Sequence, residues 1–226
     1  YGVLTKLGMP AGSTDYDSAL KEAVVAGERD AEALFWSLAI EDIGVAADIL
    51  RPVYEETSGR DGFASIEVSP RLARDTGETV REGLRLFREL GRPNVMIKVP
   101  GTAEGLPAVE QLTRHGVNVN VTLLFDTQAY EDAALAYIRG LEQRLESGQS
   151  IDGIASVASF FVSRVDTAVD PMLPDGSRLR GRVAIANARI AYRLFKRLFS
   201  GSKWERLAAA GGRPQRLLWA STGTKN

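Results

Sequence analysis

Short runs in which apolar and polar residues alternate are separated along this chain by longer segments of helical periodicity. The runs predict five strands, at residues 63–70, 94–100, 116–125, 154–162 and 216–221. Apolar positions at helical spacing predict helices between them, at about 75–90, 102–114, 127–147, 181–199 and 204–210. Alternating strands and helices are typical of a parallel sheet with right-handed crossovers. We therefore expect a single α/β domain over residues 1–226.

The chain before the first strand is expected to be mostly helical. Residues 1–14 have no clear period and should be irregular, and Asp15 or Asp17 could cap a helix that Gly27 ends. Residues 30–57 have helical spacing, and Gly44 and Pro52 predict that this helix is divided into two pieces. Further along, residues 168–180 are expected to form a loop, and the helix after them should turn inward the residues Ile185, Ala188 and Ala191.

Several predicted strands have one aliphatic face and one mixed, polar face. In residues 116–125 the alternation assigns Val117, Val119, Val121 and Leu123 to one face, and Asn118, Asn120, Thr122 and Leu124 to the other. An open doubly wound sheet usually has strands that are apolar on both faces. The pattern instead favours a (β/α) barrel, in which aliphatic residues pack under outer helices and polar residues converge inside near the carboxyl end.

Lys98 stands out because it lies near the carboxyl end of a strand that is otherwise apolar. One interpretation is a strand-end lysine that extends into solvent or pairs with a carboxylate. The other is an amine held in a partly desolvated site, where it can form a Schiff base with a carbonyl substrate. The strand alone does not decide between them.

Further polar residues are predicted to converge on Lys98 if the strands close up. They are Glu67, Asn120, Thr122 and Ser159. A glutamate beside a lysine could be a structural ion pair, and interior hydroxyl and amide groups could fill the taper of a barrel. Five polar inward positions near one end make a poor core, however, so the pattern favours a site.

A second polar cluster follows the last two predicted strands. Ser163 and Arg164 come after one strand, and residues 221–225 (STGTK) follow the other. Backbone N–H groups, hydroxyls and cations at the carboxyl face can hold a phosphate group. The alternative is a polar tail, and the spacing of a P-loop is absent.

Composition narrows the chemistry further. The chain is 44% hydrophobic and 25% charged with a net charge of −1, so no global field argues for nucleic-acid or membrane binding. The absence of cysteine excludes disulfides and thiolate chemistry and is compatible with a cytoplasmic protein. A serine-type triad would need His115, the single histidine, which is expected at a helix C-terminus, where it complements the helix dipole.

Five ordered blocks of the sequence resemble those of transaldolase, in the form common in actinobacteria and related bacteria. The blocks are residues 65–70 (SIEVSP), 95–102 (VMIKVPGT), 116–125 (GVNVNVTLLF), 158–164 (ASFFVSR) and 219–226 (WASTGTKN). The resemblance covers about residues 12–226 and implies a class I, aldolase-like (β/α)8 barrel of TIM type that uses no metal or cofactor.

The resemblance also implies an activity. Such a transferase of the pentose phosphate pathway moves a dihydroxyacetone unit between sugar phosphates through a lysine Schiff base. Its donors are sedoheptulose 7-phosphate or fructose 6-phosphate, and its acceptors are erythrose 4-phosphate or glyceraldehyde 3-phosphate. Sugar phosphates are then the expected partners, the cytoplasm is the expected location, and association into a homo-oligomer remains open.

Site residues follow from the resemblance position by position. Lys98 matches the Schiff-base lysine, and Glu67 and Thr122 match the pair that holds a catalytic water. Residues that match the dihydroxyacetone pocket are Asn120, Ser159 and Phe161. Those that match the phosphate site are Arg164, Ser221 and Lys225.

The sequence departs from the family pattern at its ends. Family members begin with two further strands, one with an acid/base aspartate and one with a Thr-Thr-Asn-Pro motif, and they have a last strand that is not recognisable here. We therefore expect strands three to seven of an eight-stranded barrel, incomplete at both ends, with residues 1–11 unmatched. Two alternatives to transaldolase activity stay open: a catalytically impaired fragment that binds sugar phosphate or is merely structural, and a class I aldolase acting on fructose 6-phosphate.

Overall fold

The structure, a computed structural model, describes residues 16–25, 27 and 29–223. The predicted irregular segment 1–14, the candidate cap Asp15 and the candidate phosphate ligand Lys225 lie outside these described residues. No helix in the described part of the chain is long and apolar enough to cross a membrane.

The five predicted strands are confirmed and form one parallel sheet. They are β1 (Ala64–Glu67), β2 (Val95–Pro100), β3 (Val119–Leu124), β4 (Ser156–Phe161) and β5 (Arg216–Ala220). Their order in the sheet is the order along the chain, β1-β2-β3-β4-β5, and every neighbouring pair is parallel. A doubly wound sheet reverses direction at a switch point, which this sheet does not have.

Helices alternate with the strands. Two precede the sheet, α1 (Asp17–Val25) and α2 (Ala31–Glu56), and the others are α3 (Thr76–Leu90), α4 (Gly105–Arg114), α5 (Thr127–Glu146), α6 (Ser163–Val169), α7 (Val183–Leu198) and α8 (Ser202–Ala209). Single turns of 3-10 helix occur at Pro70–Leu72 and Asp170–Met172. Right-handed crossovers that always advance in one direction bring the connecting helices to the same face of the sheet.

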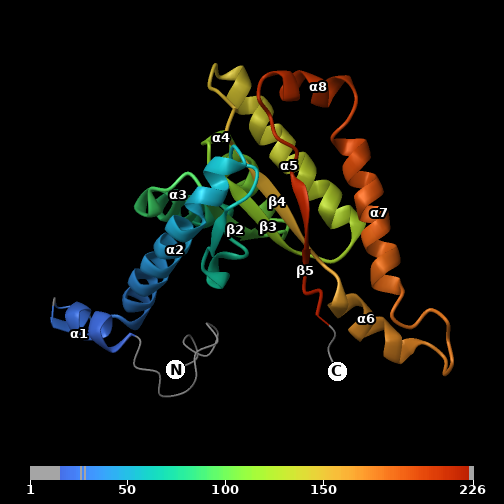
Figure 1. Ribbon diagram of the computed structural model, residues 1–226, viewed down its shortest axis with the longest axis horizontal. Helices are drawn as coiled ribbons and strands as arrows, with labels where there is room; N and C mark the ends of the chain where they lie inside the picture. The colour runs from blue at the N-terminus through green and yellow to red at the C-terminus, as the bar shows by residue number, and fades with distance from the viewer. Residues whose placement is uncertain (1–15, 26, 28, 224–226) are drawn as a thin grey trace.

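The main core lies between that helical face and the sheet, as Figure 1 shows for α3, α4 and α5. Strand residues fully buried in it include Val95, Ile97, Val99, Val119, Val121, Ala158 and Phe160. The other face of the sheet has no covering helix among those that connect the strands, and it contains the polar side chains. This one-sided arrangement is that of a (β/α) barrel, as predicted.

Strand β3 is irregular at the end that carries Thr122. Its register against β4 shifts between Val121 and Leu124, and Leu123 has a left-handed backbone with φ of 62°. As a result Leu124 is fully buried in the core and Leu123 is 47% exposed. The predicted faces of these two leucines are therefore wrong, because a β-bulge adds one residue and inverts the alternation after it.

Asn118 holds three strands together beneath the polar face. Its side-chain amide donates to the carbonyls of Pro93 (2.8 Å) and Val95 (3.1 Å), and its carbonyl accepts from the backbone N–H of Ala155 at 2.9 Å. These bonds link β3 to the amino ends of β2 and β4. Asn118 was predicted to share the face of Asn120, and its fully bonded amide gives it a structural role.

Two arginines connect the two outer strands at their amino ends. Arg213 donates to the carbonyl of Gly59 at 2.5 Å, and Arg216 forms an ion pair with Asp61 at 2.9 Å and a bond to the carbonyl of Arg60. In a flat sheet β1 and β5 would be roughly 19 Å apart, four strand spacings, which is beyond the reach of a side chain. The sheet is therefore curved, so that its outer strands approach each other at their amino ends; Figure 1 shows the strands β2 to β5 of this sheet.

Three other predictions were wrong. Helix α2 is one continuous helix: Pro52 cannot bond the carbonyl of Asp48, but both residues lie on the exposed side, where water can satisfy it. The expected loop at 168–180 begins instead with the end of α6 and a 3-10 turn. Ile185 does not face inward, since it is 48% exposed, whereas Ala191 is buried as predicted.

Candidate active site

Lys98 and Glu67 lie side by side at the carboxyl end of the sheet. They are register partners on β2 and β1, and Lys98 Nζ is 3.0 Å from Glu67 Oε2. Their side chains are 31% and 44% exposed, so the pair is open to solvent and is not a buried ion pair. Exposed pairs contribute about 0–1 kcal/mol to stability, so folding alone gives little reason for a lysine here.

Asn120 continues this row of polar side chains on the next strand. It is the register partner of Lys98, and it is only 4% exposed. Its amide nitrogen donates to Ser65 Oγ at 3.3 Å, and its carbonyl oxygen accepts from Ser159 Oγ at 2.7 Å. Side chains from β1, β3 and β4 are thus bonded to one another around the lysine of β2, and this fixes the orientation of the Asn120 amide.

Thr122 lies one pleat further toward the carboxyl end of β3. Its hydroxyl is buried and has no hydrogen-bond partner among the described residues. A buried hydroxyl without a partner costs stability, unless a water or a ligand supplies the missing bond. The left-handed Leu123 directly follows it, and strained backbone of this kind is concentrated at functional sites.

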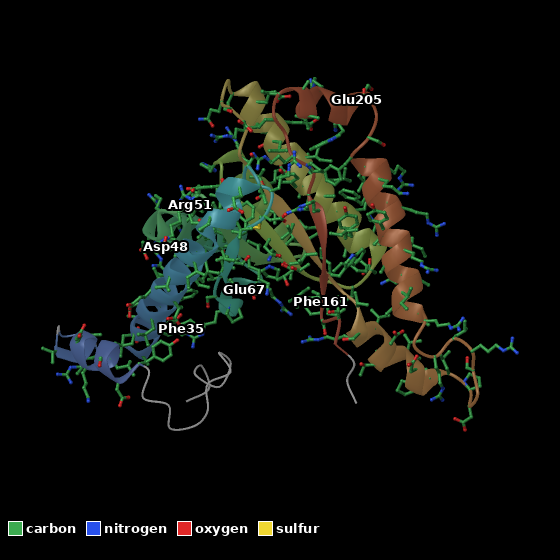
Figure 2. The ribbon with its side chains drawn as sticks, in the orientation of Figure 1. Phe35, Asp48, Arg51, Glu67, Phe161 and Glu205 are labelled. Atoms are coloured by element: carbon green, nitrogen blue, oxygen red, sulfur yellow. The ribbon has the colours of Figure 1, made fainter. Side chains whose placement is uncertain are left out.

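Aromatic residues and Arg164 adjoin the polar group on the next strand. Phe161 ends β4, and its ring is stacked on Phe125 with centroids 4.9 Å apart. The Arg164 guanidinium lies over the Phe161 ring, 5.0 Å from its centroid. Figure 2 shows Glu67 and Phe161 at the same, lower end of the sheet. Arg164 therefore presents its charge at the end of the sheet where Lys98 lies.

Ser221 follows the last strand and contacts the start of α6. Its carbonyl accepts from the N–H of Ser163 at 2.8 Å, and the two hydroxyls are 3.1 Å apart. Ser221 has a left-handed φ of 53°, which turns the chain sharply at the end of β5. These bonds bring the two halves of the predicted phosphate cluster together, apart from Lys225, which lies outside the described residues.

The arrangement suits carbonyl chemistry at an amine. A lysine nitrogen that has lost its proton can attack a carbonyl carbon, and a carboxylate 3.0 Å away can take and return the protons that this step and the later loss of water require. Among the described residues, no group of three or more histidine, aspartate or glutamate side chains is close enough to share a metal ion.

Two contributing residues were not in the predicted set. Ser65 holds Asn120, and its place two residues before Glu67 on the same strand was a usable signal. Phe125 stacks on Phe161. The alternation of apolar and polar residues could not predict on which face of the sheet Phe125 lies, because the bulge in β3 comes just before it.

The fold and the site together define a class of protein: an α/β domain of barrel type that carries a lysine–carboxylate pair at the carboxyl ends of its parallel strands. The model of the family described as "Transaldolase/Fructose-6-phosphate aldolase" matches residues 4–226, beginning earlier than the resemblance in the sequence suggests. The chain belongs to this family.

Individual relatives agree with that assignment. The chain is similar to a transaldolase of Trichodesmium erythraeum, with 47% identity over 229 residues that cover 96% of this chain and 60% of the relative. It is similar to transaldolase 2 of Nostoc sp., with 49% identity and the same two coverages. A transaldolase of Thermobifida fusca is 50% identical over 93% of this chain and 58% of its own length. The chain thus spans about 60% of the length of the curated relatives it matches.

Proposed function

We propose that the protein is a transaldolase that transfers a dihydroxyacetone unit between sugar phosphates through a Schiff base on Lys98. The observation that carries the proposal is the amine of Lys98, 3.0 Å from the Glu67 carboxylate at the carboxyl end of the sheet. Membership of the family and relatives named transaldolase support it. We expect the reaction to belong to carbohydrate metabolism in the cytoplasm.

In the proposed reaction, the Lys98 nitrogen attacks the C2 carbonyl of the ketose phosphate. Glu67, with a water held near the Thr122 hydroxyl, returns a proton so that the carbinolamine loses water and becomes an iminium ion. The iminium draws the electrons of the C3–C4 bond toward nitrogen as that bond breaks, and the C4 hydroxyl gives its proton to Glu67 through the water held near Thr122. The aldose leaves, and the enamine that stays on Lys98 attacks the aldehyde carbon of the acceptor, whose oxygen takes back the proton. Water then hydrolyses the product iminium, which releases the new ketose phosphate and frees Lys98.

The remaining residues are proposed to bind the substrate. Asn120 and Ser159 would hydrogen-bond the hydroxyls of the dihydroxyacetone unit, beside the ring of Phe161. Arg164, Ser221 and Lys225 would bind the phosphate, which needs a cation and donors at a distance from the lysine. The cation–π contact of Arg164 with Phe161 supports this role, because it holds the guanidinium in one orientation.

Borohydride trapping tests the central step. The chain is incubated with fructose 6-phosphate and reduced, and the adduct is located by intact mass and peptide mapping. We expect one adduct, on Lys98, that disappears in Lys98→Ala and persists in the control Lys203→Ala, whose exposed lysine lies on α8. An adduct that persists in Lys98→Ala would contradict the proposal.

The description of the family names a second candidate, fructose-6-phosphate aldolase, which would use the same lysine. A transaldolase forms free aldose only as fast as an acceptor removes the bound three-carbon unit, whereas an aldolase releases dihydroxyacetone without an acceptor. Measuring the release of both glyceraldehyde 3-phosphate and dihydroxyacetone, with and without erythrose 4-phosphate, separates the two: acceptor-dependent release of glyceraldehyde 3-phosphate indicates transaldolase, and release of dihydroxyacetone indicates aldolase. An adduct on Lys98 without turnover in either assay would instead support the impaired, sugar-phosphate-binding alternative.

A further inference from the structure

The Arg164 guanidinium, a cation of the proposed phosphate site, is oriented by an aromatic ring. Among the described residues Arg164 forms no ion pair with a carboxylate and no side-chain hydrogen bond, and its guanidinium lies over Phe161, 5.0 Å from the ring centroid. The N–H donors of Arg164 are therefore free for a ligand, and the Phe161 ring sets where they point. An exposed arginine without such a contact samples many rotamers, and ordering it on binding costs affinity.

Phe125 in turn restrains the ring of Phe161. The two rings stack with their centroids 4.9 Å apart and an angle of 28° between their planes. Phe161 ends β4 and is only partly buried, so the strand alone leaves its side chain several rotamers. Stacking on Phe125 restricts these rotamers. The ring of Phe161 thus links Phe125 to Arg164.

Helix α7 fixes the backbone at both ends of this aromatic link. The side-chain amide of Asn187 donates to the carbonyl of Phe125 at 2.7 Å. Asp166, two residues after Arg164 on α6, accepts from the backbone N–H of Ala184 in the first turn of α7 at 2.8 Å. Figure 1 shows α6 and the start of α7 next to each other at the lower end of the sheet. Phe125 and Arg164 are therefore both fastened to the same helix.

We propose that Phe125 is a positioning residue for the phosphate of the substrate, and that it acts on Arg164 through Phe161. The inference rests on the proposed function, in which Arg164 binds that phosphate. A phenyl ring has no hydrogen-bond donor for a phosphate, so Phe125 acts through the guanidinium. Without the Phe125 ring, Phe161 gains rotamers and Arg164 loses its fixed orientation. The protein then distinguishes phosphorylated from unphosphorylated sugars less well.

A comparison of fructose 6-phosphate with fructose tests the proposal, because the two ketoses differ in the phosphate alone. Borohydride trapping at increasing sugar concentration gives the preference for the phosphorylated sugar. Phe125→Leu keeps apolar volume but removes the ring, so it should lower this preference about three- to tenfold. Phe125→Tyr keeps the ring and should keep the preference. Equal losses with both sugars in Phe125→Leu are the mark of a merely structural role and overturn the proposal.

A second variant keeps the test open if Phe125→Leu does not fold. Asn187→Ala removes the bond to the Phe125 carbonyl, so it should lower the preference in the same direction. The matched control is Tyr192→Leu. Tyr192 also stacks on a phenylalanine, Phe195, and also has a cation, Lys196, over its ring, but all three lie on α7. This control should keep the preference of the wild type.

A double-mutant cycle checks that Phe125 acts through Arg164. Arg164→Met removes the charge and keeps much of the apolar side chain, so it should lower the preference for fructose 6-phosphate by itself. If the effect of Phe125 passes through the guanidinium, the double variant F125L/R164M should lose no more than Arg164→Met alone. A further loss as large as that of Phe125→Leu in the wild type overturns the proposal.

Titration calorimetry with glycerol 3-phosphate separates this proposal from the proposed function. This phosphate ester has no carbonyl group, so its binding does not depend on a Schiff base. Phe125→Leu should raise its Kd about three- to tenfold, and Phe125→Tyr should keep the wild-type value. If no adduct forms on Lys98, the proposed function fails while the calorimetry still decides the role of Phe125. Adducts on Lys98 with an unchanged Kd in Phe125→Leu overturn this inference alone, and a wild type that binds no glycerol 3-phosphate overturns it as well.

Discussion

At the scale of single residues, the candidate site combines exposed reactive groups with buried orienting groups. Lys98 and Glu67 reach solvent, whereas Asn120, Thr122 and Ser159 are at most 4% exposed. The buried amide of Asn120 is held on both sides, by Ser65 and Ser159. Groups that are fixed before the substrate arrives lose little entropy when they bind it.

Thr122→Val should separate function from stability. Removing a buried hydroxyl that has no partner leaves no other group unsatisfied, so the free energy of unfolding should stay the same or rise by about 1 kcal/mol. If the hydroxyl holds the water used for proton transfer, the rate of adduct formation with fructose 6-phosphate should fall at least about tenfold. Urea denaturation and timed borohydride trapping measure the two quantities.

The matched control for that variant is Thr113→Val. Thr113 is also buried, and its hydroxyl also has no partner among the described residues, but it lies on helix α4. The free energy of unfolding of this variant should also stay the same or rise by about 1 kcal/mol. Adduct formation with fructose 6-phosphate should keep the wild-type rate. Equal rates in both variants would remove Thr122 from the proposed mechanism.

At the scale of elements, the bulge at the end of β3 decides which side chains enter the core. Strict alternation would send Leu123 to the face of Val119 and Val121, but Leu124 is the residue buried with them. The cost is a left-handed leucine, about 1–2 kcal/mol, which the burial of Leu124 offsets. In this arrangement the carbonyl of Thr122 accepts the N–H of Gly101, so the loops after β2 and β3 stay close together.

A pair of alanine substitutions tests the bulge. Leu124→Ala should lower the free energy of unfolding by about 2–5 kcal/mol, because it opens a cavity in the core. Leu123→Ala should lower it by less than about 1 kcal/mol, since Leu123 is 47% exposed. Urea denaturation of both variants gives the comparison. The opposite order would mean that β3 keeps its regular alternation in solution.

At the scale of the whole molecule, the sheet is curved and fastened at one end. Arg213 and Arg216 connect the start of β5 to residues 59–61 before β1, more than 150 positions away in the chain. The carboxyl ends, where the candidate site lies, have no such connection between β1 and β5 among the described residues. The fold therefore holds one end of the sheet together, and the end that carries the candidate site has no such link among the described residues.

The double substitution R213M/R216M should test this fastening. It keeps most of the apolar part of each side chain but removes the bonds to Gly59, Arg60 and Asp61, so we expect the free energy of unfolding to fall by about 1–3 kcal/mol. The control Arg206→Met removes only a long, 3.6 Å pair between Arg206, which is 64% exposed, and Glu142, and it should cost less than about 0.5 kcal/mol. Equal, small effects in both proteins would show that the arginines do not hold the two strands together.

Much of the fold could be predicted because local pattern and tertiary structure agree. The alternation around Lys98 survives intact: Val95, Ile97 and Val99 are fully buried, and Lys98 lies on the other face. Prediction failed where a long-range contact overrides the local signal. Gly44 looked like a helix break, yet it lies within α2 where the Arg92 side chain packs so closely that a Cβ would be only 3.0 Å from it.

The sequence by itself determined the five strands, most of the helices between them and the polar face of the sheet, because helical and strand periodicities are local properties that each segment carries alone. Only the tertiary structure decided which polar residues meet: the row of Glu67, Lys98 and Asn120 depends on the register of three strands. It also decided the bulge in β3 and the closure of one end by Arg213 and Arg216. Register and curvature arise from packing between segments that are distant in the chain, and no single segment contains that information.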